Sequence, residues 1–322
     1  MSEWKEYKFS DFVEINPNVT LPSDECISYV EMKDLNESEK FCFPSSERKK
    51  GNGSKFQNYD TLFARITPCL ENGKICQVRG LKNNVGLGST EFIVFRGKRN
   101  VSDTDFIFYL SRWDDVRSHA EINLDGTSGR QRVPIACFDD LIIKMPVDID
   151  EQKAIASILS SLDDKIDLLH RQNATLEKMA ETLFRQWFVE RRPEPDEGEA
   201  KEEWESRPLS SIANFLNGLA CQKFPPKNDI EKLPVLKIKE LNSGISENSD
   251  WATTEVNPEY IVKNGDVIFA WSASLMVKIW DGQDCILNQH LFKVTSEYYP
   301  KWFYYLWCKY HLDEFIVKAA SH

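Results

Sequence analysis

The chain has 322 residues, a hydrophobic fraction of 41% and a formal net charge of −11. This length is enough for two domains and a connector, and no run of about 18 apolar residues predicts a membrane span. The eight cysteines form no C-x-x-C pair and histidine occurs five times, which argues against a zinc site and a disulfide framework. The first residues do not resemble a signal peptide, so we expect a cytoplasmic protein without a bound metal.

In chain order, residues 1–147 are predicted to form a first domain of mixed α and β structure. Short apolar runs that follow turn residues predict strands at 62–66 and 92–95, and residues 140–145 predict another. Residues 103–119 have helical spacing, with Phe106, Leu110, Trp113 and Val116 on one face. The polar stretch 124–132 contains two glycines and is predicted to be a loop before the strand at 140–145.

Residues 148–192 are predicted to form one helix, roughly 60 Å long at about 1.5 Å per residue. Asp148 and Glu151 predict a capping box at its start, and Pro193 ends it. Residues spaced alternately by four and three form a heptad seam without Gly or Pro. The seam positions are Ile155, Leu159, Leu162, Ile166, Leu169, Asn173, Leu176, Ala180, Leu183 and Trp187.

In aqueous solution, another apolar surface must cover such a seam. One interpretation is a helix packed on its own domain. We favour a spacer that pairs with a partner helix, with Asn173 setting the register. Residues 151–205 carry 8 Lys and Arg against 14 Asp and Glu, a net charge of −6, so this stretch of the helix and the acidic linker 193–205 hold more than half of the net charge of −11. An acidic spacer is suited to a basic partner protein.

Residues 206–322 repeat the first domain at an offset near 200, which predicts a duplicated domain. Five collinear matches carry the repeat: Trp4–Phe12 with Trp204–Ile212, Val30–Asn36 with Leu236–Asn242, Tyr59–Arg65 with Gly265–Trp271, Lys74-Ile75 with Lys278-Ile279, and Phe106–Leu110 with Trp302–Leu306. The sequence stops just before the counterpart of the Gly126 loop. We therefore expect the second domain to be incomplete, without that loop, its closing strand and a second helix.

Several polar residues are candidates for contact with DNA, although each alone is more often part of a solvated loop. The basic loop 48–55 suits phosphates, whereas Arg reads guanine and Gln reads adenine in the major groove. Gln289 and His290 stand where the first copy has Ser89, Thr90 and Glu91, so the two copies could specify different half-sites. The candidates are Lys49, Lys50, Lys55, Arg65, Lys74, Thr127, Ser128, Arg130, Gln131, Arg132, Lys237, Lys239, Lys278, Gln289 and His290.

The start of the long helix is similar to that of a known family. The matching residues are Pro146, Glu151, Gln152, Ile155, Leu159, Asp163 and Ile166. Together with the duplication, this pattern resembles the specificity subunit of type I restriction–modification enzymes. The resemblance implies an α+β fold in which a coiled-coil-forming helix separates two duplicated target recognition domains. Each domain would read one half of a bipartite site in double-stranded DNA, and the helix would set their spacing.

The resemblance also implies partners and the absence of a catalytic site in this chain. Methyltransferase subunits would dock on the helix seam and bring S-adenosylmethionine. Restriction subunits would bring ATP- and Mg-dependent translocation and cleavage. In this family two such helices run antiparallel, so we expect the single helix here to pair with that of a second copy or with a methyltransferase helix.

Two other classes of function stay open. A non-catalytic adaptor would use both domains and the coiled coil to bind proteins, which the acidic charge favours. A metal-dependent nuclease would use Asp196, Glu199 and Lys201, but these lie in a charged, proline-flanked linker that predicts no strand. The linker interpretation is therefore the better one.

Overall fold

The computed structural model describes residues 3–23, 25–49, 51–127, 129–190, 207–246, 248–272 and 274–320. The chain divides into two compact units, unit 1 (Met1–Asn173) and unit 2 (Ala174–His322). Within the described ranges, none of the helices has the length and apolar character needed to cross a membrane. The predicted linker 193–205 lies outside the described residues.

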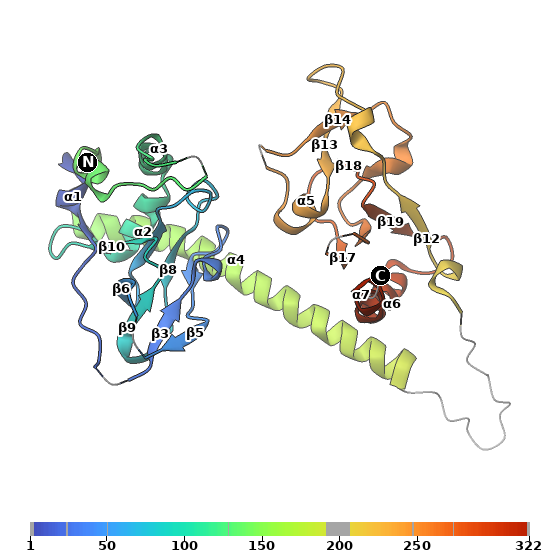
Figure 1. Cartoon of the computed structure of the whole chain (residues 1–322), viewed down its shortest axis with the longest axis horizontal. Helices are drawn as coiled ribbons and strands as arrows, with labels where there is room; N and C mark the ends of the chain where they lie inside the picture. The colour runs from blue at the N-terminus through green and yellow to red at the C-terminus, as the bar shows by residue number, and fades with distance from the viewer. Residues whose placement is uncertain are drawn as a thin grey trace. The chain divides into compact units, whose positions relative to one another are not determined.

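Unit 1 mixes strands with short helices, as Figure 1 shows. Its strands form a five-stranded sheet β2-β10-β7-β8-β4, a four-stranded sheet β5-β3-β9-β6 and a pair β1-β11. The elements before the long helix are β1 (Trp4–Lys8), α1 (Phe9–Phe12), β2 (Val13–Ile15), β3 (Ile27–Val30), η1 (Met32–Asp34), β4 (Phe41–Cys42), β5 (Ser46–Arg48), β6 (Ser54–Gln57), β7 (Thr61–Ala64), β8 (Ile75–Val78), η2 (Lys82–Asn84), β9 (Val85–Gly88), β10 (Phe92–Gly97), α2 (Thr104–Arg112), α3 (Asp114–Ile122), η3 (Ile135–Asp139) and β11 (Ile142–Pro146).

Unit 2 contains two four-stranded sheets, β12-β19-β16-β17 and β14-β13-β18-β15. Its elements after the long helix are η5 (Leu209–Ser211), β12 (Asn214–Asn217), η6 (Cys221–Lys223), β13 (Lys232–Leu236), α5 (Ile238–Ser243), β14 (Trp251–Thr253), η7 (Pro258–Tyr260), β15 (Ile261–Val262), β16 (Val267–Ala270), β17 (Met276–Ile279), β18 (Cys285–Leu287), β19 (Leu291–Thr295), α6 (Lys301–Tyr310) and α7 (Leu312–Ala320). The predicted α+β class is confirmed.

The strand pairing of the two units confirms the duplication. In unit 1, β3 pairs parallel with β9, with Val30 opposite Gly88; in unit 2, β13 pairs parallel with β18, with Leu236 opposite Leu287. The antiparallel order β2-β10-β7-β8 recurs as β12-β19-β16-β17. The predicted strands at 62–66, 92–95 and 140–145 correspond to β7, β10 and β11.

The register corrects one of the five sequence matches. The backbone N–H of Ala64 donates to Lys74, whereas Ala270 at the end of β16 pairs with Met276. Lys74 therefore corresponds to Met276, and Lys278 lies two residues further along its strand. A single apolar strand gives little register information in sequence because alternate residues repeat the same pattern.

The predicted single helix at 103–119 is two helices, so that prediction was wrong. Trp113 has an extended conformation (φ −64°, ψ 138°) between α2 and α3, and its side chain is 44% exposed. Its carbonyl accepts the N–H groups of Val116 and Arg117 at the start of α3. After the bend, Val116 and Ala120 are buried in the core of unit 1.

The long helix α4 (Ile149–Phe184) is confirmed, and a π-helical turn (Arg185–Glu190) continues it (Figure 1). Asp148 Oδ1 accepts the N–H of Asp150 at 3.0 Å and so caps the start. The capping box with Glu151 stays a prediction. Glu151 Oε1 accepts the indole N–H of Trp4 at 3.3 Å, which ties the helix to β1. The compact-unit boundary after Asn173 divides α4 between the two units. The domain limits from sequence remain a prediction.

A fully buried glutamine holds the first turn of α4 in unit 1. Gln152 Oε1 accepts the N–H of Asp103 at 2.8 Å. Its Nε2 donates to the carbonyls of Val101 (3.0 Å) and Pro146 (2.9 Å). One side chain thus pairs with three backbone groups, two from the segment 101–103 and one from the end of β11, and an apolar residue would leave them without this partner.

Replacing Gln152 by alanine is expected to lower the free energy of unfolding of unit 1 by about 2 kcal/mol or more, because buried backbone groups lose their partners. Thermal and urea denaturation of the purified chain would measure this loss. The exposed neighbour Lys153 provides the control. Equal midpoints for Gln152→Ala and Lys153→Ala would contradict the anchoring role.

Candidate nucleic-acid interface and docking helix

In unit 1, three sequence candidates meet where β7 ends. The carbonyl of Arg65 accepts the N–H of Val133 at 2.8 Å, and Ile66 forms a β-bridge with Arg132. The loop 124–132 is thereby held against the strand end, and Gln131 donates its N–H to Thr67 Oγ1 at 3.1 Å. Arg65, Gln131 and Arg132 are therefore brought together.

A carboxylate orients the exposed guanidinium of this cluster. Arg132 Nη2 and Nε donate to the two carboxylate oxygens of Glu91 at 2.7 and 2.9 Å, and this contact raises the pKa of Arg132. A bidentate contact fixes the plane of a guanidinium. Arg132 Nη1 also donates to the carbonyl of Arg130 at 3.4 Å. Sequence reasoning named Glu91 only as part of a differing turn. In the sequence alone, the negative charge of Glu91 argues against DNA contact. The structure shows that this charge pairs with Arg132.

The equivalent strand end of unit 2 carries different side chains. Trp271 follows β16 as Arg65 follows β7, and its indole is 42% exposed. Its ring lies 5.8 Å from that of His290 and 6.0 Å from that of Phe292, centroid to centroid. The indole N–H donates to Asn217 Oδ1 at 3.3 Å, and Gln289 Nε2 lies 3.4 Å from His290 Nε2. Trp271 and Asn217 were missed as candidates, although the repeat already aligned Trp271 with Arg65.

Three of the remaining candidate lysines contact groups of their own unit. Lys74 Nζ donates to the carbonyl of Met32, and Lys278 Nζ donates to that of Leu241, each at 3.1 Å. Both therefore hold the short helix of their unit. Lys237 pairs with Asp250, and Lys239 is exposed on α5. Their roles in DNA binding stay predictions.

The other basic candidates of unit 1 lie on two loops. Lys49 and Lys55 are exposed where β5 leads to β6, on a different sheet from Arg65. Thr127 and Arg130 are exposed at the tip of loop 124–132, where the N–H of Arg130 donates to the carbonyl of Thr127 at 3.0 Å. Lys50 and Ser128 lie outside the described residues.

Unit 1 is attached to α4 by a partly buried polar cluster. Tyr109 donates its hydroxyl to Asp163 at 2.6 Å, and burial together with this hydrogen bond raises the pKa of Tyr109. Lys40, only 5% exposed, donates to Ser160 Oγ at 2.7 Å and lies 5.0 Å from the centre of the Tyr109 ring. Burial lowers the pKa of Lys40. Asp163, which belongs to the family-like pattern, thus has a structural role here.

Unit 2 is attached to the last part of α4 by the equivalent tyrosine. Tyr305 donates its hydroxyl to Glu177, and Lys309 Nζ contacts Glu177 at 2.8 Å and Glu181 at 2.6 Å. Phe184 packs beside this cluster, 5.0 Å from the ring of Trp307. The hydrogen bonds from Lys309 and Tyr305 lower the pKa of Glu177, and burial first, then the contact with Glu177, raises the pKa of Tyr305 to about 12.

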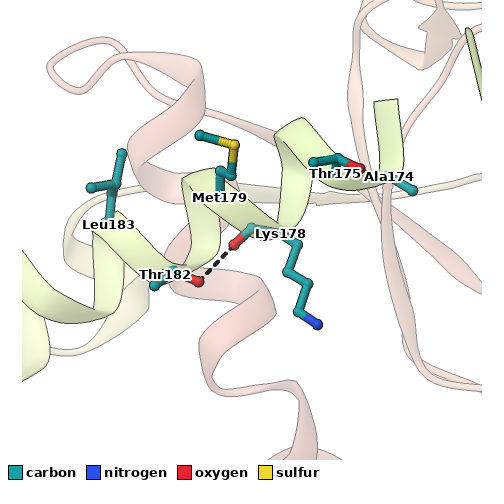
Figure 2. A pocket seen from close by; sticks show the side chains of 6 residues that line it. All are labelled: Ala174, Thr175, Lys178, Met179, Thr182 and Leu183. Atoms are coloured by element: carbon teal, nitrogen blue, oxygen red, sulfur yellow. Dashed lines mark hydrogen bonds between the residues drawn. The ribbon is translucent and has the colours of Figure 1, made fainter. Parts of the chain in front are cut away.

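The predicted seam of α4 is open to solvent over most of its length in this chain. Ile155 packs partly into the core of unit 1, whereas Leu159, Leu162, Ile166, Leu169, Leu176, Leu183 and Trp187 are between 36% and 62% exposed. Beside the seam, Ala174, Thr175, Lys178, Met179, Thr182 and Leu183 line a hollow (Figure 2). Met179 and Leu183 point to one side of the helix there, and Lys178 points to the other. The interpretation as a helix covered by its own domain does not fit these exposures.

The region that a nuclease would use, residues 195–201, lies outside the described residues. Among the residues that the structure does describe, no three His, Cys, Asp or Glu side chains are grouped so that they could hold a metal ion.

Two equivalent surfaces of different chemistry and a helix with an open apolar seam define a duplicated binding architecture. The chain belongs to the type I restriction modification DNA specificity domain family, which it matches over residues 1–178 and 201–322. The specificity subunit of the type I restriction enzyme EcoAI from Escherichia coli is 29% identical over 190 residues, 56% of this chain and 32% of that subunit. The chain therefore spans about a third of the length of that relative.

Other relatives cover more of the chain. The MjaIX specificity subunit of Methanocaldococcus jannaschii is 24% identical over 260 residues, 74% of this chain and 59% of that protein. Among solved structures, the S subunit from M. genitalium matches with a TM-score of 0.47 and 12% identity, covering 99% of this chain and 80% of the other. The HsdS subunit from Thermoanaerobacter tengcongensis matches with a TM-score of 0.40 and 18% identity, covering 97% and 80%.

The attachment of α6 to α4 is expected to weaken in acid. Because the folded-state pKa of Glu177 is lowered below the ordinary value of 4.5, its contribution to stability is present above that value and is lost as the pH falls through the folded-state pKa. Hydrogen exchange of α6 across this range would measure the loss. Glu177→Gln should remove part of the acid dependence, whereas Asp167→Asn, at an exposed pair with Arg171, should retain it. Identical acid profiles for both variants would contradict this attachment.

Proposed function

We propose that this chain is a non-catalytic specificity subunit that reads a bipartite sequence in double-stranded DNA. The observation that carries the proposal is the duplicated strand-end surface: one backbone arrangement presents Arg65, Glu91 and Arg132 in unit 1 but Trp271 and His290 in unit 2. Two similar frameworks with different side chains suit two different half-sites. The family match supports the same function.

The proposal assigns the chemistry to partner subunits. Methyltransferase subunits would bring S-adenosylmethionine, and restriction subunits would bring ATP- and Mg-dependent cleavage, while this chain supplies no cofactor. Because the DNA of a bacterial or archaeal cell lies in the cytoplasm, the chain would act there. The relatives from Escherichia coli and Methanocaldococcus jannaschii are named specificity subunits of type I restriction enzymes, which supports this division of labour.

Co-expression with the methyltransferase subunit of the same system is expected to produce one methylated bipartite motif with two different halves. Pull-down of the complex followed by methylome sequencing would measure this. A stable complex that neither methylates nor binds DNA in a salt-dependent way would contradict DNA recognition and favour a protein-binding adaptor.

The open seam of α4 is the proposed docking surface for a second helix. Exposed Leu and Ile side chains at heptad positions are unfavourable in water, and the free energy falls when a partner helix buries them. The partner would be α4 of a second copy or a helix of the methyltransferase subunit. Asn173, at the middle of the seam, would set the register of the pair.

Self-pairing predicts that the purified chain is dimeric at micromolar concentration and that Leu169→Glu makes it monomeric, because a carboxylate would be buried in the seam. Leu168 offers a matched control: it is 41% exposed, against 42% for Leu169, but lies outside the seam. Sedimentation should therefore leave Leu168→Glu dimeric. A strictly monomeric wild-type chain would contradict self-pairing and leave the methyltransferase helix as the partner.

A further inference from the structure

The turn before β19 in unit 2 has the same backbone hydrogen bonds as the turn before β10 in unit 1. Ser89 donates its N–H to Val30, and Asn288 donates its N–H to Leu236. Side-chain oxygens of Ser89 and Asn288 accept the N–H groups of Glu91 (3.2 Å) and His290 (3.3 Å), respectively.

The neighbouring strand ends agree as well. Arg65 donates its N–H to Glu91 at 3.0 Å, and Trp271 donates its N–H to His290 at 3.4 Å. Positions 65 and 91 of unit 1 are thus structurally equivalent to positions 271 and 290 of unit 2. This equivalence rests on the backbone hydrogen bonds. The two units therefore share the backbone arrangement at these positions but carry different side chains.

The chemistry at these equivalent positions differs in kind. Unit 1 has two guanidinium groups here: that of Arg65 is half-buried, and that of Arg132 is exposed and oriented by Glu91. Guanidinium N–H pairs match the N7 and O6 acceptors of guanine. Unit 2 presents an exposed indole beside an amide side chain, Gln289. An apolar ring suits the methyl group of thymine, and a Gln amide suits the N6 and N7 atoms of adenine.

The unit 2 cluster is supported from within its own fold. Phe292 lies against the ring of Trp271, and Asn217 holds the indole N–H. A Cβ on Gly218 would come within 2.2 Å of the carbonyl oxygen of Asn288, so glycine lets β12 approach the turn closely. The indole is therefore positioned by its neighbours while almost half of its surface is exposed.

From this juxtaposition we propose that Trp271, Gln289 and His290 are specificity-determining residues of unit 2 that recognise A·T base pairs. In unit 1, Arg65, the counterpart of Trp271, and Arg132, which pairs with Glu91, the counterpart of His290, recognise guanine. This inference rests on the proposed function and deepens it: the two half-sites differ because the same framework presents aromatic and amide groups in one unit and guanidinium groups in the other.

The test uses the full chain in complex with the methyltransferase subunit of the same system. The wild-type motif is expected to have one half with a required guanine and one half with a required A·T pair. Trp271→Ala and Gln289→Ala should each relax the A·T half, with about tenfold weaker discrimination, and leave the guanine half unchanged. Arg65→Ala should relax the guanine half alone, which assigns each half to its unit.

Each variant contains an internal control. The half-site read by the unchanged unit reports whether the complex still folds and binds DNA. Trp251→Ala provides a matched control: this indole is 40% exposed in the same unit, but it lies on β14 over Lys232. It should leave the motif unchanged.

Several outcomes would overturn the inference. One is an unchanged motif in both the Trp271 and Gln289 variants, and another is relaxation by Trp251→Ala to the same extent. A palindromic wild-type motif would mean that unit 2 does not read DNA, while the proposed function of unit 1 would stand. Absence of both methylation and DNA binding by the assembled wild-type complex would instead remove the proposed function itself, and this inference with it.

Discussion

The apolar seam of α4 is the constraint on which the rest of this structure depends. A helix with several exposed Leu and Ile side chains in heptad order is costly in water at about 25 cal/mol for each Å² of apolar surface. At the start of the seam, Ile155 packs against the core of unit 1. Beyond that point, the seam residues Leu159, Leu169 and Leu176 are between 36% and 62% exposed.

The contacts between each unit and α4 combine apolar packing with specific polar contacts. Tyr109 reaches Asp163 in one case and Tyr305 reaches Glu177 in the other, and the two tyrosines occupy the same position of the repeat. Hydroxyl-to-carboxylate hydrogen bonds fix a side chain in direction as well as distance. At the helix start, Gln152 adds three hydrogen bonds to backbone groups. Apolar packing alone would leave the helix freer to rotate or slide against its units.

The duplication separates what the fold requires from what recognition requires. Equivalent N–H groups pair with equivalent carbonyls at both strand ends, so the backbone of the turn is maintained by main-chain and short side-chain contacts. The exposed side chains beside those contacts are not needed for them. Unit 2 can therefore have His290 where unit 1 has Glu91, and Trp271 where unit 1 has Arg65, with the same backbone arrangement. The overall charge of −11 says little about such local surfaces, because much of it lies in the spacer and linker.

The sequence by itself determined the long helix, the duplication, the α+β class and the strands at 62–66, 92–95 and 140–145, because these follow from periodicity and from repeated patterns along the chain. It also identified the loop that carries Arg132. Only the tertiary structure decided that Trp113 divides α2 from α3, since an extended residue between helices serves packing with distant segments. It also decided that Lys74 and Lys278 hold carbonyl groups of their own units, and that Trp271 stands beside His290. These facts depend on strand register and on contacts between residues far apart in sequence, which no local pattern specifies.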